Sequence, residues 1–251
     1  MNNLPDGNKT VSIIICAVNH IMLTALKHIS VPTNKKKVKL ICLSNLSDII
    51  HCTEQHHPEF IIIDAEPRQC LFLLYRLRSR FGYLPVMFTS KTFLFSDRIT
   101  SEFFGGVLLR DYDSLMNAFP QFSPIDLSCN NAFAGPEYAG SAPVYKVTPD
   151  TGISEDTLVQ VLNIWLLSRL PGIIPSMTGR AIIMLCVVDD MSVEKIAGIM
   201  QISDKSIYYH RSRVMKTLGI KRVRHDLIKS LRFFKDMYYE TTFPTALSTR
   251  G

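Results

Sequence analysis

Over its first 120 residues the chain alternates short apolar segments with segments of helical spacing. The apolar segments, rich in β-branched residues, predict strands at residues 11–16, 38–43, 58–64, 85–89 and 107–109. The segments between them predict helices at residues 20–29, 46–55, 71–80 and 97–104. Strands that are apolar on both faces are typical of parallel sheets covered by helices. The sequence therefore predicts a doubly wound α/β domain whose site lies at the carboxyl ends of the strands.

The rest of the chain is helical in pattern and follows a stretch rich in Pro, Gly and Ser. Helical spacing resumes at Ser154, a predicted helix cap, and this first helix is expected to end at Pro171 and Gly172. We expect an α/β domain joined by a linker to an all-α domain. The predicted bounds are residues 9–120 for the α/β domain, 121–153 for the linker, 154–170 for a connecting helix, 171–240 for the helical domain and 241–251 for a tail.

The composition excludes several classes of protein. With 47% hydrophobic and 20% charged residues, the chain is not disordered as a whole. Its longest apolar runs are far shorter than the roughly 20 residues that cross a bilayer, and its first residues lack the basic segment of a signal peptide. We expect a cytoplasmic protein with no membrane partner.

Side chains that bind metals are scattered along the sequence. None of the six cysteines forms a C-x-x-C pair, so a disulfide framework is not expected. The segment that contains His51, Cys52, His56 and His57 has no second pair elsewhere at zinc spacing. We expect neither a metal nor a cofactor.

Positive charge is concentrated in one segment. The chain has a net charge of +6, whereas residues 204–235 alone contain ten Lys or Arg and two Asp or Glu. A solvated helix face accounts for many such runs, but a local excess of basic residues is also typical of proteins that bind the phosphate backbone of nucleic acids. The sequence motif within this segment distinguishes a solvated helix face from a nucleic-acid-binding surface.

Residues 192–219 have the pattern of a helix-turn-helix. Ile196 and the small Ala197 form the inner face of a short scaffold helix, which permits close approach of the next helix. Ile202 is predicted to fill the turn and Ser203 to cap the second helix. The side chains of the second helix that are predicted to point inward are Ile207, Val214 and Leu218.

The opposite face of this second helix is suited to DNA. It carries Lys205, Tyr208, Tyr209, Ser212, Arg213 and Lys216. The basic side chains predict phosphate contacts, and the tyrosines with Ser212 predict contacts to base edges. The alternative is a small helical bundle that only shares the pattern.

The C-terminal pattern resembles the LuxR/FixJ/NarL-type transcription regulators. The family's motifs S-x-x-E-I-A, I-S-x-K-T-V, H-R and L-G-V fall without gaps on Ser192, Ile196 and Ala197, Ile202 and Ser203, Lys205 to Ile207, His210 and Arg211, and Leu218 to Ile220. The resemblance implies that the DNA-binding residues are Lys205, Ser206, Tyr208, Tyr209, Arg211, Ser212, Arg213 and Lys216. The chain departs from the family at Arg180, Asp190 and Lys195, where the family has Glu, Gly and Glu.

The resemblance also implies a fourth helix that supports dimerisation in relatives, here over residues 224–238. Its apolar face would consist of Leu227, Ile228, Leu231 and Phe234. The alternative is that these side chains only pack on the core of their own module.

Next to such a module, the α/β domain resembles the receiver domain of response regulators, which accepts a phosphoryl group on an Asp that ends its third strand. Asp64 falls on that position, Thr89 on the family's switch Ser/Thr, and Arg110 on its Lys. Receivers hold Mg²⁺ on two carboxylates after the first strand, but residues 17–20 are Ala-Val-Asn-His. We therefore predict a pseudo-receiver with a vestigial phosphoacceptor pocket formed by Asp64, Thr89 and Arg110. The alternative is that Asp64 is only a strand-end residue paired with Arg110.

These features favour a sequence-specific, DNA-binding transcription regulator of LuxR type that does not depend on phosphorylation. The expected partners are double-stranded DNA, a second copy or a related regulator, and RNA polymerase. The alternative is a response regulator switched by phosphorylation of Asp64. An enzyme is not expected, because the α/β part has no Gly-rich phosphate loop and no G-x-S-x-G motif.

Overall fold

The computed structural model describes residues 10–31, 37–118, 152–187, 189, 191–221 and 223–234. By their internal contacts the described residues divide into two compact units. One unit contains the β-sheet, and the other combines Leu94–Phe103 with Ile153–Lys235. We call them the sheet unit and the helical unit. None of the helices among the described residues is both long and apolar enough to span a membrane.

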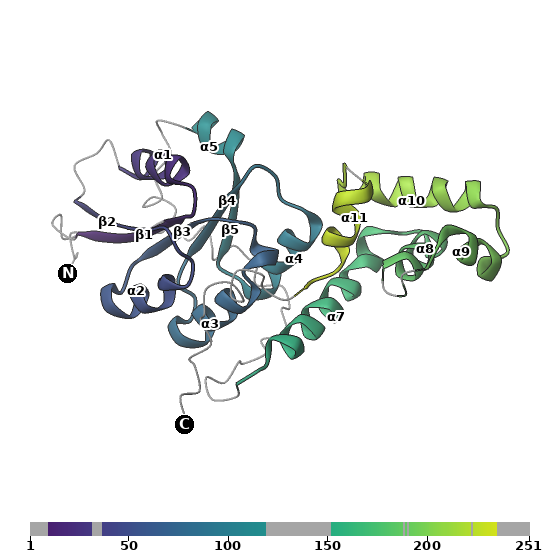
Figure 1. Cartoon of the computed structure of the whole chain (residues 1–251), viewed down its shortest axis with the longest axis horizontal. Helices are drawn as coiled ribbons and strands as arrows, with labels where there is room; N and C mark the ends of the chain where they lie inside the picture. The colour runs from purple at the N-terminus through teal and green to yellow at the C-terminus, as the bar shows by residue number, and fades with distance from the viewer. Residues whose placement is uncertain are drawn as a thin grey trace, which may run out of the picture. The chain divides into compact units, whose positions relative to one another are not determined.

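The sheet consists of five parallel strands in the order β2-β1-β3-β4-β5 (Figure 1). The strands are β1 (Val11–Ala17), β2 (Val38–Leu43), β3 (Phe60–Asp64), β4 (Val86–Ser90) and β5 (Val107–Asp111). This order confirms the predicted doubly wound fold. The strands are added to one side of β1 and then to the other, so the strand order reverses between β1 and β3. The carboxyl ends of these two central strands therefore flank the position where such folds hold their ligands.

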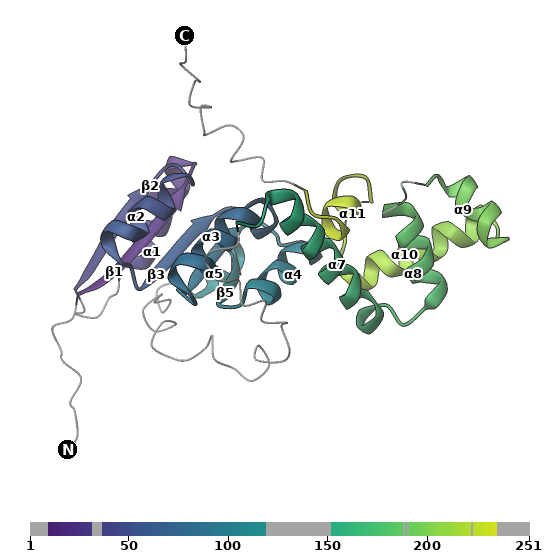
Figure 2. The same cartoon turned by 90° about the horizontal axis from the view of Figure 1, so that it is seen from below.

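Helices cover the sheet on both sides, as its apolar strands require. Helices α1 (His20–Ser30) and α5 (Tyr112–Ala118) lie on one face, and α2 (Asp48–His56) and α3 (Leu71–Phe81) lie on the other (Figures 1 and 2). A 3-10 turn, Pro67–Gln69, precedes α3. The side chains of Ile13, Ile15 and Ile62 are fully buried in one core cluster with Leu26 of α1 and Leu115 of α5.

The helical unit contains α4 (Phe95–Phe104, of which Phe104 groups with the sheet unit), α7 (Glu155–Ile173), α8 (Met177–Val187), α9 (Val193–Met200), α10 (Asp204–Leu218) and α11 (Val223–Leu231). Helix α7 buries Leu158, Leu162, Leu166 and Leu170, a stripe with a spacing of four residues. Ser154 caps α7 as predicted, because its side chain accepts a hydrogen bond from the Thr157 amide.

Two helix ends differ from the prediction. Helix α7 does not end at Pro171 but contains it and runs to Ile173. Pro171 lies in the last turn, so the single lost donor does not stop the helix, and the Ile174 amide closes it by donating to Leu170 O at 2.7 Å.

Helix α11 ends at Leu231, whereas the sequence predicts a helix over residues 224–238. The side chain of Asn163 on α7 binds the backbone of Phe233 twice. The Phe233 amide donates to Asn163 Oδ1 at 2.8 Å, and Asn163 Nδ2 donates to Phe233 O at 3.3 Å. These bonds replace the intrahelical bonds that a longer helix would use. The predicted tail and all but the last two residues of the predicted linker lie outside the described residues.

Candidate nucleic-acid interface

The helix-turn-helix forms because each helix boundary has a side chain or backbone conformation that suits it. The Ser192 hydroxyl accepts a hydrogen bond from the Lys195 amide at the start of α9. Gln201 takes the left-handed conformation, with φ of 53°, and ends α9. The Ser203 hydroxyl accepts a bond from the Ser206 amide at 3.2 Å, which confirms the predicted cap of α10. Gly219, also left-handed, ends α10.

The inner faces of the two helices pack as the sequence predicts. Ile196, Ala197 and Ile207 are buried in one cluster with Ile182 of α8, and Ile202 packs against it from the turn. Gly179 of α8 lies so close to α10 that an added Cβ would be 3.0 Å from the side chain of Val214. This close approach fixes α10 against α8 and turns its remaining side chains outward.

The outer face of α10 carries the predicted DNA-binding residues. Tyr208 is 50% exposed and Tyr209 62% exposed, so both rings are accessible to a partner. The Arg211 guanidinium lies 4.9 Å from the centre of the Tyr208 ring, a cation–π contact that holds both side chains in place. Lys205, Ser212, Arg213 and Lys216 are exposed.

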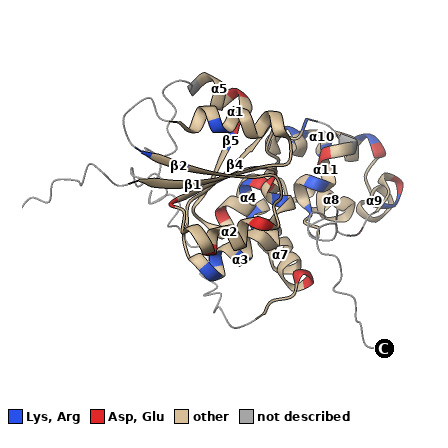
Figure 3. Cartoon of the chain, turned by 60° about the vertical axis from the view of Figure 1, so that its left-hand side comes forward, with Lys and Arg blue, Asp and Glu red and all other residues tan. Residues whose placement is uncertain are grey.

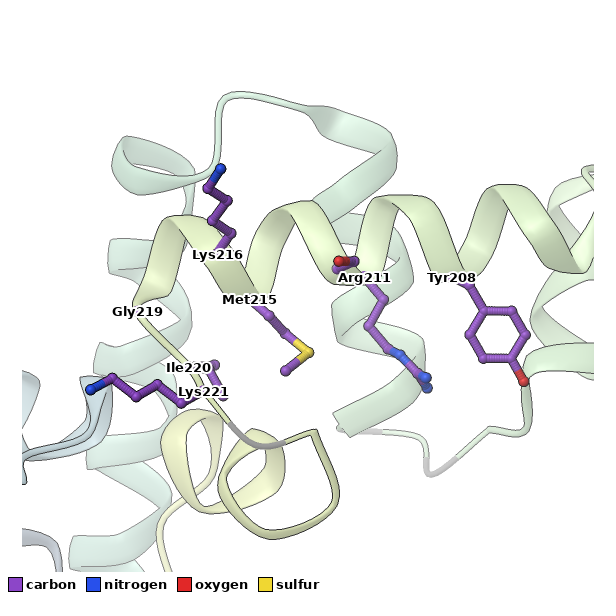
Figure 4. A pocket seen from close by; sticks show the side chains of 8 residues that line it. Tyr208, Arg211, Met215, Lys216, Gly219, Ile220 and Lys221 are labelled. Atoms are coloured by element: carbon purple, nitrogen blue, oxygen red, sulfur yellow. The ribbon is translucent and has the colours of Figure 1, made fainter.

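Two hollows lie on this face, and Ser212 and Lys216 line both of them. The first, of about 620 Å³, is also lined by Tyr208, Arg211, Met215, Gly219, Ile220 and Lys221. Figure 4 shows Arg211 and Met215 projecting from one side of α10 and Lys216 from the other. The second hollow, of about 580 Å³, is also lined by Tyr209, Arg213 and Thr217. The eight predicted residues therefore share one helix, and six of them line the two hollows.

Two predicted residues line neither hollow. Ser206 is half-buried, and its hydroxyl lies 3.0 Å from the Ser203 hydroxyl, so it takes part in the cap of α10. Lys205 is exposed in the first turn. Lys221, which the motif did not indicate, also lines the first hollow. It is the next basic residue after the predicted end of the helix, and that position could have pointed to it. Figure 3 marks the basic positions of α10 and α11 in blue.

The carboxyl edge of the sheet brings the predicted receiver residues into one row. Across the sheet, Ala17 of β1, Asp64 of β3, Thr89 of β4 and Arg110 of β5 are neighbours in register. The Thr89 hydroxyl donates to Asp64 Oδ1 at 3.1 Å. The sequence motif therefore located Asp64 and Thr89 side by side at the expected edge.

Tyr112, which no sequence motif indicated, also binds Asp64. Its hydroxyl donates to the same oxygen, Asp64 Oδ1, at 2.8 Å. Burial and the hydrogen bond to Asp64 raise the pKa of Tyr112 above its ordinary value, so the hydroxyl keeps its proton and remains a donor. No spacing in the sequence links Tyr112 to Asp64, since the contact depends on where β5 ends and α5 begins.

The interpretation that Asp64 pairs with Arg110 is wrong. Among the described residues, no hydrogen bond or ion pair joins them, and Asp64 instead accepts from two neutral hydroxyls, both at Oδ1. Arg110 lies one strand further along the sheet, in register with Thr89 and not with Asp64.

The residues that follow β1 beside Asp64 carry no carboxylate. Ala17 stands in register with Asp64, and Val18 is 64% exposed. Asn19 serves another purpose, because its Oδ1 accepts a hydrogen bond from the Ile21 amide at 2.8 Å and so caps α1. In the part of the chain that the structure describes, no group of three His, Cys, Asp or Glu side chains is placed to hold a metal.

Of the four apolar residues in the predicted dimer face of the last helix, only two are exposed. Leu227 and Leu231 are buried, and they pack within the helical unit. Ile228 and Phe234 are 45% and 50% exposed. The four residues thus do not form one face, since α11 ends before Phe234.

Comparison with known proteins agrees with this architecture. The family model described as Sigma-70, region 4 matches residues 179–218, which include α9, the turn and α10. No curated protein matches the sequence significantly. Among solved structures, the chain is similar to a structure that contains two RcsB dimers bound to two parallel DNAs. The TM-score is 0.51 at 13% identity, and the match covers 89% of this chain and 98% of that chain.

Two further structures are similar at lower scores. The complex of the two-component response regulator RcsB with DNA is 14% identical, with 94% and 100% of the chains covered and a TM-score of 0.48. Full-length FixJ from B. japonicum is 13% identical, with 87% and 94% covered and a TM-score of 0.36. The first likeness and the region-4 match show a receiver-like α/β fold followed by a helix-turn-helix domain. The resemblance predicted from sequence is thereby confirmed at the level of the fold.

Proposed function

We propose that the protein is a transcription regulator that binds double-stranded DNA in a sequence-specific manner through α10. The observation that carries the proposal is the outer face of α10, where exposed tyrosines and basic side chains project from a helix that is capped at both ends and packed on α8. A helix of this kind places its side chains in the major groove. The similar structure of RcsB dimers bound to DNA favours the same partner and a dimer here. RNA polymerase is a further proposed partner, as for other regulators of this type.

Binding is tested with the full chain and labelled duplex DNA of about three helical turns at low salt. Selection from a library of random duplexes then identifies the preferred sequence. A folded chain that binds no duplex at low salt would contradict the proposal.

Within α10, we expect alanine substitutions to separate two kinds of interaction with DNA. Lys205→Ala and Arg213→Ala should weaken binding to all sequences alike, and each should reduce the salt dependence by about one phosphate contact. Tyr208→Ala and Ser212→Ala should instead change the base preference, by about 1–3 kcal/mol for each base that is no longer recognised. Binding selections on each variant measure both effects. Lys39→Ala, which removes an exposed lysine from β2, is the control. Unchanged base preference in both of the latter variants would show that another face of α10 meets the bases.

We further propose that this activity does not depend on phosphorylation of Asp64. Mg²⁺ neutralises the phosphoryl oxygens during transfer, and its removal costs several kcal/mol of transition-state stabilisation. Neither Ala17 nor Val18 can ligate the ion, and the Asn19 side chain caps α1.

Acetyl phosphate with Mg²⁺ is therefore expected to leave Asp64 unmodified, and Asp64→Ala is expected to change transcription little. Mass spectrometry of the intact protein measures the modification, and a reporter gene measures transcription. The variant Val18→Asp/Asn19→Asp tests the reason, because it supplies two carboxylates while Asp at position 19 still caps α1. We expect this variant to acquire Mg²⁺-dependent phosphorylation. A stable phosphate on Asp64 of the unchanged chain would favour the phospho-switched alternative.

A further inference from the structure

Helix α4 is encoded between β4 and β5, yet its residues Leu94–Phe103 belong to the helical unit by their contacts. Helix α4 is thus flanked in sequence by segments of the sheet unit, and it contacts α7, α10 and α11 of its own unit. Hydrogen bonds, an ion pair and a ring contact join α4 to these three helices.

The first contact reaches the proposed DNA-reading helix. Arg98 Nη2 donates a hydrogen bond to the carbonyl oxygen of Leu218, the last residue of α10, at 3.0 Å. Carbonyls in the last turn of a helix have no partner within the helix, and the helix dipole is negative at this end. A guanidinium is therefore well suited to this position, since it supplies both a donor and a positive charge.

The second contact repeats the arrangement on the next helix. The hydroxyl of Ser96, which is fully buried, donates to the carbonyl oxygen of Lys229 at 2.7 Å. Lys229 lies in the last turn of α11. Two side chains that are two residues apart in α4 thus donate to C-terminal carbonyls of two different helices.

The other end of α4 holds α7. The Phe103 ring meets the ring of Trp165 edge-on, with 5.9 Å between centroids. Glu102 forms an ion pair of 3.7 Å with Arg169, whose guanidinium lies 4.0 Å from the centre of the Trp165 ring. Helix α4 is therefore fixed at both of its ends within the helical unit.

We propose that α4 is a working part of the DNA-binding unit: by capping α10 and α11 it orders the end of the reading helix, so that a segment from within the α/β sequence sets DNA affinity. This inference rests on the proposed function. It implies that the DNA-binding unit is not contiguous in sequence. It also implies that a change in the segment between β4 and β5 alters binding without any contact to DNA.

The test compares three variants of the full chain. In Arg98→Ala the donor to Leu218 is removed, in Arg98→Lys the charge and one donor remain, and in Arg76→Ala an arginine of α3 is removed as a control for net charge. Arg98 is exposed, and its guanidinium lies 6.0 Å from the centre of the Phe95 ring, so the substitution leaves no cavity in the core. Duplex affinity is measured by fluorescence anisotropy.

A second measurement does not involve DNA. The amides of Gly219 and Ile220 donate to Lys216 O at 3.2 Å and to Met215 O at 2.8 Å, and they close the end of α10. Their hydrogen exchange reports whether that end is ordered. Both measurements are made on the same samples.

For Arg98→Ala we expect about tenfold weaker DNA binding and about tenfold faster exchange of these amides, since a hydrogen bond from a charged donor is removed. Arg98→Lys should restore part of both, and Arg76→Ala should change each by less than about twofold. Unchanged exchange in Arg98→Ala would show that α4 does not order α10. Faster exchange with unchanged affinity would show a structural contact with no role in binding. If the unchanged chain binds no duplex, the proposed function fails with the affinity part of this proposal, while the exchange result still decides whether α4 caps α10.

Discussion

An increase in salt from 50 to 200 mM is expected to weaken DNA binding by about 10³- to 10⁵-fold, the value for six to ten neutralised phosphates. Each protomer exposes Lys205, Arg213, Lys216 and Lys221 on or next to α10. If each of two protomers on one site neutralises about three to five phosphates, the total falls in this range. Every neutralised phosphate releases a condensed counterion, and released ions bind back more readily at high salt.

The measurement is a titration of labelled duplex with protein at several salt concentrations, plotted as the logarithm of affinity against the logarithm of salt. The slope gives the number of phosphates contacted. Substitution of one phosphate-binding lysine lowers the slope, which serves as the internal control. A slope near zero, with tight binding retained at high salt, would contradict the electrostatic interface on α10.

The second large effect is expected for Arg78 of α3, which stabilises the sheet unit. Its guanidinium donates to four backbone carbonyls: Gly82 O at 3.2 Å, Leu84 O at 2.6 Å, Phe104 O at 3.1 Å and Gly105 O at 2.7 Å. These carbonyls belong to the turn before β4 and the turn before β5. Burial lowers the pKa of Arg78 to about 10, so the side chain is still charged at neutral pH and the hydrogen bonds compensate for its desolvation.

Arg78→Ala is therefore expected to reduce the free energy of unfolding by about 3 to 5 kcal/mol, because it leaves several carbonyls without a donor at once. Arg78→Lys should recover only a small part, since an ammonium lacks the planar fork that reaches both turns. Denaturant unfolding, followed by circular dichroism, measures the loss. The matched control is Arg80→Ala on the same helix, which breaks a solvent-exposed pair with Glu54 and should cost less than about 1 kcal/mol. Equal losses for Arg78→Ala and Arg80→Ala would contradict the role of Arg78.

The sequence was sufficient wherever structure follows from the spacing of residues along the chain. Five apolar segments predicted the five strands because a parallel sheet buries both faces of each strand. The helix-turn-helix was equally predictable. The cap at Ser203, the buried Ile207 and the glycine after α10 all act within a few residues of their own position.

Only the tertiary structure decided which residues far apart in sequence meet. Asp64 accepts from Tyr112 rather than pairing with Arg110, because the hydroxyl at the start of α5 reaches the carboxylate. Asn163 binds the backbone of Phe233 and thereby ends α11 earlier than its pattern predicts. Arg98 of α4 caps α10, although the spacing of α4 assigns it to the α/β domain. The sequence by itself determined the local elements and the residues on the outer face of α10, for which we propose the contact with DNA. Hydrogen bonds between distant segments leave no periodic signal in a sequence, so the partners of Asp64, Asn163 and Arg98 became known only from the packed structure.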